Sequence, residues 1–268
     1  MSPLEPIPVD GPVVFFTGAG ISVGAVLPTY RGKGGLYETS DLEPPSIDDV
    51  TRERLPRLWA RFRSRLATTH RPRPSRAHSA IAHLEQTLDA PVTVITQNVD
   101  LLHTKAGSRR VVNLHGTYAQ VVCLDCGHTM SRAALAEQLE AANPGFAERA
   151  EQLGGLAVAP DADAVVTDTD SFHFVDCPAC AGMLKPDIVY FGESVRKEVV
   201  AQAYSLIEQS DALLVAGSSL TVFSGYRFVR HAAALGMPIA IVNRGPTRGD
   251  DLATVKVDNG CSPMLALL

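Results

Sequence analysis

Patterns typical of buried strands alternate with helical patterns along most of this chain of 268 residues. Runs such as Val-Val-Phe-Phe at 13–16 and Val-Thr-Val-Ile at 92–95 have the length and composition of strands buried on both faces. The expected strands are 12–17, 92–97, 111–114, 187–191, 212–217, 238–243 and one near Val255, and the expected helices are a short one after Ser22, 51–69, 78–88, 197–209 and 225–235. This alternation predicts an α/β fold with a parallel sheet that is covered by helices on both faces.

Polar side chains gather just after one of these runs. Thr96-Gln97-Asn98-Val99-Asp100 follows the strand at 92–95, and His103 and His115-Gly116 come soon afterwards. In open α/β sheets, ligands bind beyond the carboxyl ends of the strands. An amide, a carboxylate and an imidazole close to one strand end indicate a reaction centre.

A glycine-rich turn follows the first strand. The order of strand, Gly18-x-Gly20 and helix start lets backbone N–H groups meet a pyrophosphate. The usual dinucleotide fingerprint would place a third glycine at the position of Val23, and no acidic residue ends a clear second strand about 20 residues later. A tight turn without a ligand therefore stays open for this motif alone. Gly217-Ser218-Ser219 and Asn243, at two later strand ends, favour a nucleotide.

Four of the five cysteines form two pairs, Cys123-x-x-Cys126 and Cys177-x-x-Cys180. This is the zinc-ribbon pattern, in which four thiolates surround one tetrahedral ion. Two redox pairs or scattered core thiols are the alternatives. Four protein ligands leave no open position, so we expect one structural Zn²⁺ per chain. Cys261 stands apart, and we expect it to pack in the core.

Composition narrows the class of partner and the location. The net charge of −5 argues against a general nucleic-acid binder, although residues 57–76 are locally very basic and read as a solvated helix face. No apolar run reaches the roughly 20 residues that a membrane span needs. Residues 1–11 are rich in proline and acidic, unlike a signal or transit peptide. We expect a cytoplasmic protein that binds neither nucleic acid nor membrane.

Read together, these motifs resemble the sirtuin family of NAD-dependent protein deacylases, from about Pro12 to the end. The resembling segments are Gly18-Ala-Gly-Ile-Ser22, Pro28-Thr-Tyr-Arg31, Gly35-Leu-Tyr37, Thr96-Gln-Asn-Val-Asp100, Leu102-His103, His115-Gly116, the two cysteine pairs, Lys185-Pro-Asp-Ile-Val-Tyr-Phe-Gly-Glu193, Gly217-Ser-Ser-Leu220 and Asn243. The chain looks most like class II, the group that contains the mitochondrial lipoamidase and ADP-ribosyltransferase sirtuin. The class II markers are 102–110, 123–127, Ser224-Gly-Tyr-Arg-Phe228, Gly245-Pro-Thr-Arg248 and 250–253.

The resemblance implies a division into domains. A discontinuous Rossmann-like NAD-binding domain would comprise residues 1–35, 81–118 and 184–268. A small domain would take its helical part from 36–80 and its zinc-ribbon part from 119–183. Departures from the family pattern fall near the cofactor loop, where Thr29-Tyr30 replaces Asp-Phe and Val26 replaces a common glycine.

The resemblance also implies an activity and roles for residues. An acyl-lysine carbonyl oxygen would attack NAD, releasing nicotinamide, free lysine and 2′-O-acyl-ADP-ribose. His115 would be the general base, with Asn98 and Asp100 as the other catalytic residues. The implied NAD-binding residues are Gly18, Ala19, Gly20, Ser22, Tyr30, Arg31, Tyr37, Gln97, Asn98, Val99, Asp100, Gly217, Ser218, Ser219, Asn243, Arg244, Gly245 and Cys261.

The expected partner is an acyl-lysine protein or peptide. We expect the protein itself to be a monomer. The segment Val189-Tyr190-Phe191-Gly192-Glu193 would pair with the substrate backbone as an added strand. Phe62 and Arg65 align with the Tyr-x-x-Arg pair that grips acidic acyl groups in class III, so half of that pair is present. Class II resemblance favours long or branched acyl groups, including lipoyl and methylglutaryl types. Two rivals are an ADP-ribosyltransferase or NAD hydrolase at the same site and a catalytically silent NAD-binding sensor.

Overall fold

The computed structural model describes residues 4, 7–8, 10–25, 27, 46–56, 58–60, 72–146, 148–149 and 171–268. The chain divides into two compact units, and each is described by itself. The first unit comprises residues 1–39, 72–115 and 195–268, and the second comprises residues 40–71 and 116–194.

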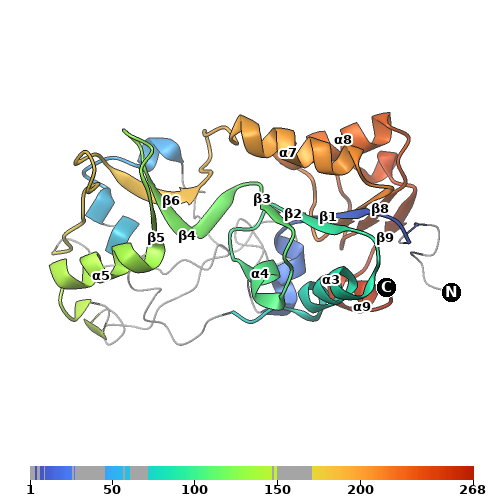
Figure 1. Cartoon of the computed structure of the whole chain (residues 1–268), viewed down its shortest axis with the longest axis horizontal. Coiled ribbons are helices and arrows are strands. Elements are labelled where there is room, and N and C mark those ends of the chain that lie inside the picture. The colour runs from blue at the N-terminus through green and yellow to red at the C-terminus, as the bar shows by residue number, and fades with distance from the viewer. Residues whose placement is uncertain are drawn as a thin grey trace. The chain divides into compact units, whose positions relative to one another are not determined.

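The first unit contains a six-stranded sheet in which every neighbouring pair is parallel (Figure 1). Its strands, in spatial order, are β3 (Val111–Asn113), β2 (Val92–Thr96), β1 (Val13–Thr17), β7 (Ala212–Ala216), β8 (Ile239–Val242) and β9 (Val255–Val257). The strand order reverses between β1 and β7. In doubly wound sheets a ligand binds at this switch point, beyond the carboxyl ends of the strands.

Helices cover both faces of this sheet, as predicted. Alternate side chains of β1 enter two separate cores, because successive residues of a strand point to opposite faces. Val13 and Phe15 pack with α3 (Arg76–Thr87) and α9 (Cys261–Leu265). Val14 and Phe16 pack with α7 (Lys197–Glu208) and α8 (Phe223–Ala234). Figure 1 shows α3 and α9 on one side of the sheet and α7 and α8 on the other.

Short helices connect the strands at their carboxyl ends. The short helix expected after Ser22 begins earlier, at Ala19, as the 3-10 helix η1 (Ala19–Ala25), so Ser22 lies within it. Two others, α4 (Leu102–Ala106) and η3 (Asp250–Leu252), were not anticipated from the sequence. These pieces lie in the loops that carry most of the expected site residues.

The second unit contains a three-stranded antiparallel sheet in the order β5-β4-β6. Its strands are β4 (Gly116–Cys123), β5 (Thr129–Ser131) and β6 (Leu184–Ile188). The helices described in full in this unit include α5 (Arg132–Ala142) and the 3-10 helix η2 (Ile47–Asp49). One strand, expected at 187–191 in the parallel sheet, was placed wrongly from the sequence. It runs instead from 184 to 188 and pairs antiparallel with β4.

The position of β6 was missed because its residues look unlike those of a buried strand. β6 has the sequence Leu-Lys-Pro-Asp-Ile, and all five residues are buried. A lysine and an aspartate argue against a buried strand, whereas the apolar run that begins at Ile188 argues for one. The burial of Lys185 is tolerated because its ammonium donates to the carbonyls of Pro186 and Ile188 and to the carboxylate of Glu193.

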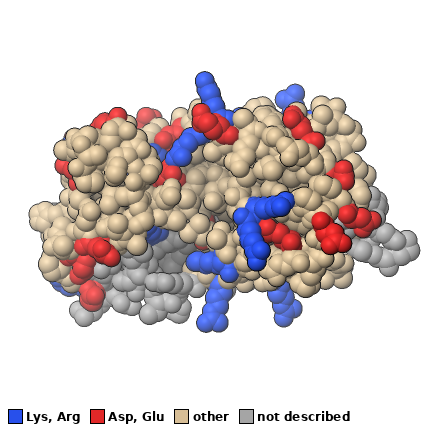
Figure 2. Space-filling view, viewed as in Figure 1, with Lys and Arg blue, Asp and Glu red and all other residues tan. Residues whose placement is uncertain are grey.

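Of the helix expected at 51–69, residues 55–56 and 58–60 are helical, and 57 and 61–69 lie outside the described residues. Among the helices that the structure describes, none is long and apolar enough to cross a membrane. On the face drawn in Figure 2, acidic and basic side chains lie interspersed among uncharged residues.

Candidate active site

Two glycine turns meet at the switch point of the parallel sheet. Gly18 follows β1 and Gly217 follows β7, and the N–H of Gly20 donates to the carbonyl of Gly217 at 2.8 Å. A Cβ atom on Gly20 would lie 2.8 Å from the Cα atom of Gly217, closer than side chains approach backbone. Gly217 itself has φ +65, a left-handed conformation that favours glycine. The missing side chains let the two turns pack backbone against backbone at the switch point, where ligands of such sheets bind.

A chain of three side chains crosses from β2 to η1 at this edge. The Asn98 amide donates to the Ser22 hydroxyl at 3.1 Å, and that hydroxyl donates to the Asp100 carboxylate at 2.7 Å. The second Asp100 oxygen accepts from the backbone N–H of Leu102 at 2.9 Å, which caps the start of α4. The amide of Asn98 also donates to the carbonyl of Gly18 at 3.1 Å. The structure therefore brings together three predicted residues from two distant segments.

His115 lies two residues after β3, and both of its ring nitrogens are engaged. Its Nδ1 lies 3.0 Å from the carbonyl oxygen of Gln97, and its Nε2 lies 3.0 Å from the hydroxyl of Ser224 in α8. A carbonyl oxygen only accepts hydrogen bonds, so Nδ1 carries the proton in the neutral ring. Nε2 is then the basic nitrogen. This is the arrangement that a general base needs.

The electrostatic surroundings keep His115 neutral. Burial lowers its pKa; the carbonyl of Gln97 opposes this shift, and the positive charge of Arg227 adds to it. A neutral imidazole near pH 7 can accept a proton. The sequence had marked Ser224 and Arg227 only as part of a class II segment, and no local pattern assigned either residue to the site.

Gln97 links the ends of three strands. Its backbone N–H donates to the carbonyl of Thr17, its carbonyl accepts from His115, and its side-chain oxygen accepts from the Ser218 hydroxyl at 2.8 Å. The hydroxyl of Ser219 instead pairs with that of Thr221 at 3.0 Å. The expected residue Gln97 thus holds the basic histidine and the loop after β7 in one place.

Two buried histidines lie beneath this cluster. His103 Nε2 contacts the hydroxyl of Thr17 at 2.9 Å, and its ring lies 4.6 Å from that of His78, edge to face. Burial lowers the pKa of His103 to about 3 and that of His78 to about 4, although the charge of Asp100 raises the latter. Both rings are neutral at physiological pH, and they support the loop rather than carry charge.

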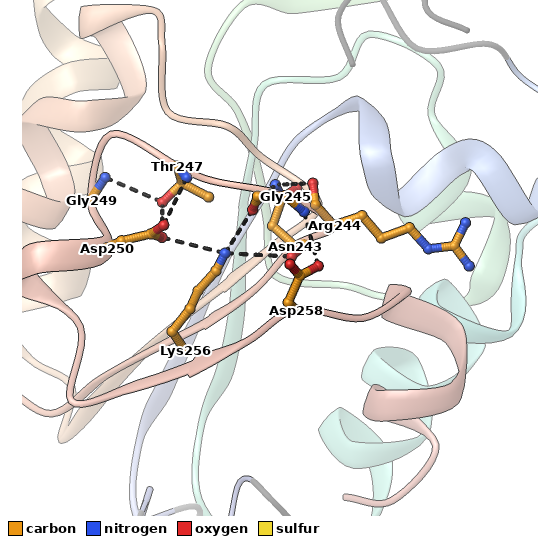
Figure 3. A network of polar contacts seen from close by, with 8 residues as sticks. All are labelled: Asn243, Arg244, Gly245, Thr247, Gly249, Asp250, Lys256 and Asp258. Atoms are coloured by element: carbon orange, nitrogen blue, oxygen red, sulfur yellow. Dashed lines mark hydrogen bonds and ion pairs between the residues drawn. The ribbon is translucent and has the colours of Figure 1, made fainter. Parts of the chain in front are cut away.

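The loop after β8 holds the residues expected at the adenosine end (Figure 3). The Asn243 amide donates to the carbonyl of Arg244 at 2.9 Å, and the N–H of Gly245 donates to the Asp258 carboxylate at 2.9 Å. The ammonium of Lys256 donates to the carbonyl of Gly245 at 2.8 Å. In Figure 3 the Arg244 side chain extends away from this network. The polar contacts shape the loop and leave that guanidinium to face outward.

Cys261 is buried at the start of α9 and packs in the core with β8, as expected. Its thiol lies 3.8 Å from the carbonyl of Val242, and burial raises its pKa to about 12. The thiol is therefore protonated at neutral pH.

The segment expected to pair with substrate lies in the second unit. Tyr190 is buried and Phe191 is 45% exposed. The Glu193 carboxylate accepts from the N–H of Tyr190 at 2.7 Å and from Lys185 at 3.1 Å. The carbonyl of Phe191 accepts from the N–H of Ile47 at 2.9 Å. The segment bends in a turn at Gly192, which has φ +87, and the N–H of Glu193 donates to the carbonyl of Tyr190 at 3.1 Å.

Tyr30, Arg31, Tyr37, Phe62 and Arg65 lie outside the described residues.

The four paired cysteines of the second unit meet in one cluster. Their Sγ atoms all lie within 4.8 Å of one another, with Cys123 and Cys180 at 3.5 Å and Cys126 and Cys177 at 3.8 Å. A disulfide would require about 2.05 Å, whereas thiolates about 2.3 Å from a tetrahedral ion lie close to 3.8 Å apart. Cys126 and Cys180 are exposed, which argues against core thiols.

The two halves of this cluster have the same turn. The N–H of Gly127 donates to the carbonyl of Cys123, and the N–H of Ala181 donates to the carbonyl of Cys177. Gly127 and Ala181 both have positive φ, +71 and +58. The four cysteines can hold one structural zinc ion, as the spacing predicted.

The fold and the switch-point cluster define a dinucleotide-binding α/β protein with a four-cysteine cluster that can hold zinc. A model of the Sir2 family matches residues 18–224. The chain belongs to this family. Sirtuins use NAD.

Curated relatives extend over nearly the whole chain. It is 64% identical over 260 residues to NAD-dependent protein deacetylase 1 of Mycobacterium avium, with 96% of this chain and 90% of the relative covered. It is 41% identical over 263 residues to the human mitochondrial NAD-dependent protein lipoamidase sirtuin-4, covering 96% and 81%.

Solved structures agree with the family assignment. One, described as a structural basis for the mechanism and regulation of Sir2 enzymes, has a TM-score of 0.71 at 33% identity and covers 94% of this chain and 89% of that one. Another, of Sir2 with a deacetylated p53 peptide and 3′-O-acetyl ADP-ribose, has a TM-score of 0.72 at 25% identity and covers 99% and 96%.

Proposed function

We propose that this protein is a class II NAD-dependent protein-lysine deacylase that releases nicotinamide and 2′-O-acyl-ADP-ribose. One observation carries the proposal: His115 presents a basic Nε2 in the same unit as the linked Asn98, Ser22 and Asp100. NAD, when bound, supplies the glycosidic bond that breaks and the sugar that accepts the acyl group. Relatives named deacetylase and lipoamidase support this chemistry.

The residues divide the work by their hydrogen-bonding capacity. His115 Nε2 accepts a proton from a ribose hydroxyl, and the Gln97 carbonyl stabilises the imidazolium that results, because Nδ1–H already donates to it. Asn98 already donates its amide hydrogens to Gly18 and Ser22, so its side-chain oxygen would accept from water or a ribose hydroxyl and orient it. Asp100 would hydrogen-bond the nicotinamide carboxamide.

The domain division, the remaining NAD contacts and substrate pairing by residues 189–193 also belong to this proposal. Ser218, Ser219, Asn243, Arg244 and Gly245 would hold the adenosine half, with the backbone of Cys261 beside the adenine. The zinc ion would stabilise the second unit and take no part in the reaction.

We propose that the preferred acyl group is larger than acetyl, since the class II segments include Ser224–Phe228 and Gly245–Arg248. The relative at 64% identity is named a deacetylase, and the human relative is named a lipoamidase. Plain deacetylation is therefore the first comparison to make. Our expectations of a monomer and of a cytoplasmic location stay predictions.

The experiment is a panel of acyl-lysine peptides (acetyl, succinyl, methylglutaryl and lipoyl) incubated with NAD and followed by mass spectrometry. We expect 2′-O-acyl-ADP-ribose, with turnover for a large acyl group above that for acetyl, and loss of turnover in His115→Ala. ADP-ribose attached to protein would favour the transferase instead. An absence of nicotinamide release with every peptide would leave a silent NAD-binding sensor.

A further inference from the structure

The basic nitrogen of His115 is already occupied in the resting protein. The Gln97 carbonyl requires the proton on Nδ1, so Nε2 has a lone pair, and the Ser224 hydroxyl 3.0 Å away must be the donor. A substrate hydroxyl that gives its proton to Nε2 needs the same lone pair. Ser224 therefore stands where the reacting hydroxyl has to arrive.

The start of α8 is packed so that Ser224 reaches this position. A Cβ atom on the next residue, Gly225, would lie 2.7 Å from the side-chain amide of Gln97 and 2.8 Å from the ring of Phe16. A glycine lets the first turn of the helix approach Gln97 this closely without displacing its side-chain amide or the ring of Phe16. Gln97 also accepts the hydrogen bond from His115 Nδ1, so one residue fixes both partners of the Ser224 contact.

The contact is also free to break. Ser224 is the second residue of α8, and among the described residues its hydroxyl contacts only His115. A serine side chain has three staggered rotamers, so a single χ1 rotation removes the hydroxyl from Nε2 without moving the helix. Phe223, the residue before it, is 49% exposed, so the helix start is not deeply enclosed.

We propose that Ser224 is a positioning residue whose hydroxyl holds the lone pair of His115 Nε2 until a substrate hydroxyl replaces it. This inference rests on the proposed function. In the exchange, one hydrogen bond from serine is lost and one from the substrate is gained. In the step that follows, the substrate O–H bond breaks, an N–H bond forms at Nε2, and the electron pair stays on the substrate oxygen.

Two consequences follow for the free protein and for turnover. A donor on Nε2 stabilises the neutral ring, so its removal raises the pKa of His115. The charged group acting on the ring is Arg227 of α8; Gln97 after β2 and Ser224 are uncharged. Removal of a competing hydrogen bond also lowers KM for NAD by roughly threefold, the scale of one net hydrogen bond.

The test compares Ser224→Ala and Ser224→Thr, which keeps a hydroxyl, with Ser205→Ala on the exposed side of α7 as the control. ¹⁵N NMR of histidine-labelled protein without NAD reports the tautomer and the pKa of His115. We expect the Nδ1–H tautomer in all forms and a raised pKa in Ser224→Ala alone. Because this readout needs no turnover, it remains informative if the proposed function fails.

Kinetics with the best acyl peptide form the second arm. We expect Ser224→Ala to lower KM for NAD, to keep kcat and to move the acidic limb of the pH profile upward. Ser224→Thr, which keeps the hydroxyl, should retain the wild-type KM, kcat and pH profile, and so should Ser205→Ala. An unchanged pKa of His115 would overturn the inference. A fall of tenfold or more in kcat with an unchanged KM would also overturn it, since Ser224 would then be relaying the proton.

Discussion

Ser22 and Asp100, separated by 78 residues in the chain, are joined by a hydrogen bond of 2.7 Å from hydroxyl to carboxylate. Ser22 is almost fully buried in η1, and Asp100 follows β2. The second carboxylate oxygen caps α4 through the N–H of Leu102. One carboxylate therefore fixes two loops at the switch point, and it needs both of its oxygens as acceptors to do so.

Asp100→Asn is expected to lose turnover and about 1–2 kcal/mol of stability, because an amide offers only one acceptor oxygen to two donors. Steady-state kinetics and thermal unfolding check this. Ser22→Ala keeps the cap on Leu102 and should cost less stability. An Asp100→Asn protein with wild-type turnover would contradict the role given to this carboxylate.

Gly217→Ala should lower the free energy of unfolding more than Gly236→Ala does. Both glycines have similar positive φ, +65 and +70, so the conformational strain of alanine is shared. A Cβ atom on Gly217 would collide with the backbone of Gly20 and Ile21, whereas one on Gly236 would have nothing within 4 Å. We expect about 1 kcal/mol for Gly236→Ala and a larger loss, with weakened NAD binding, for Gly217→Ala. Equal midpoints of unfolding would argue against crowding at the switch point.

The zinc cluster makes a prediction about metal content. Cys123→Ala removes one of four ligands, so zinc per chain should fall from one toward zero and the protein should become insoluble, because structural zinc supplies folding free energy. Elemental analysis and sedimentation measure this. The control variant is Cys261→Ala, which removes a buried thiol of the other unit. This variant should keep one zinc per chain. A Cys123→Ala protein that folds and binds NAD normally would exclude the zinc assignment.

Lys185 and Glu193 form the most buried ion pair among the described residues, with side chains 5% and 22% exposed. Glu193→Gln leaves the ammonium without its counter-charge, which we expect to cost about 3 kcal/mol. Because Glu193 also accepts from the N–H of Tyr190, KM for the acyl peptide should rise. The control, Glu208→Gln, breaks the more exposed pair with His231 and should cost at most about 1 kcal/mol. Similar losses in both variants would refute the burial argument.

Asp250 contributes a pH-dependent stability to the loop of Figure 3. Burial alone would raise its pKa, but hydrogen bonds from the hydroxyl and N–H of Thr247 and the charge of Lys256 lower it overall. A lowered pKa in the folded state gives stability that is present above the unfolded pKa, ~3.9, and lost as the pH falls through the folded value. The difference in Tm between wild type and Asp250→Asn should thus be largest near pH 7 and vanish toward pH 2. A constant difference would contradict this linkage.

Five strands of the parallel sheet, all but β9, were predictable to within two residues because their runs are largely apolar. Val13–Thr17 and Ala212–Ala216 have no polar face, so burial on both sides was the only arrangement open to them. β6 was not predictable in this way. Its Lys185 can be buried because Glu193 and two carbonyls accept hydrogen bonds from its ammonium, and those partners depend on how the chain turns.

By itself, the amino-acid sequence determined which groups are available: the four thiolates, the glycine turns, and the polar residues after β1, β2, β3 and β7. Ligand chemistry and strand burial depend on residue type and near neighbours, so local patterns predict them. Only the tertiary structure decided that Ser224, 109 residues from His115, donates to its Nε2 and that Gln97 determines the tautomer. Hydrogen-bond partners across a sheet depend on strand order and helix packing, and no local spacing contains that information.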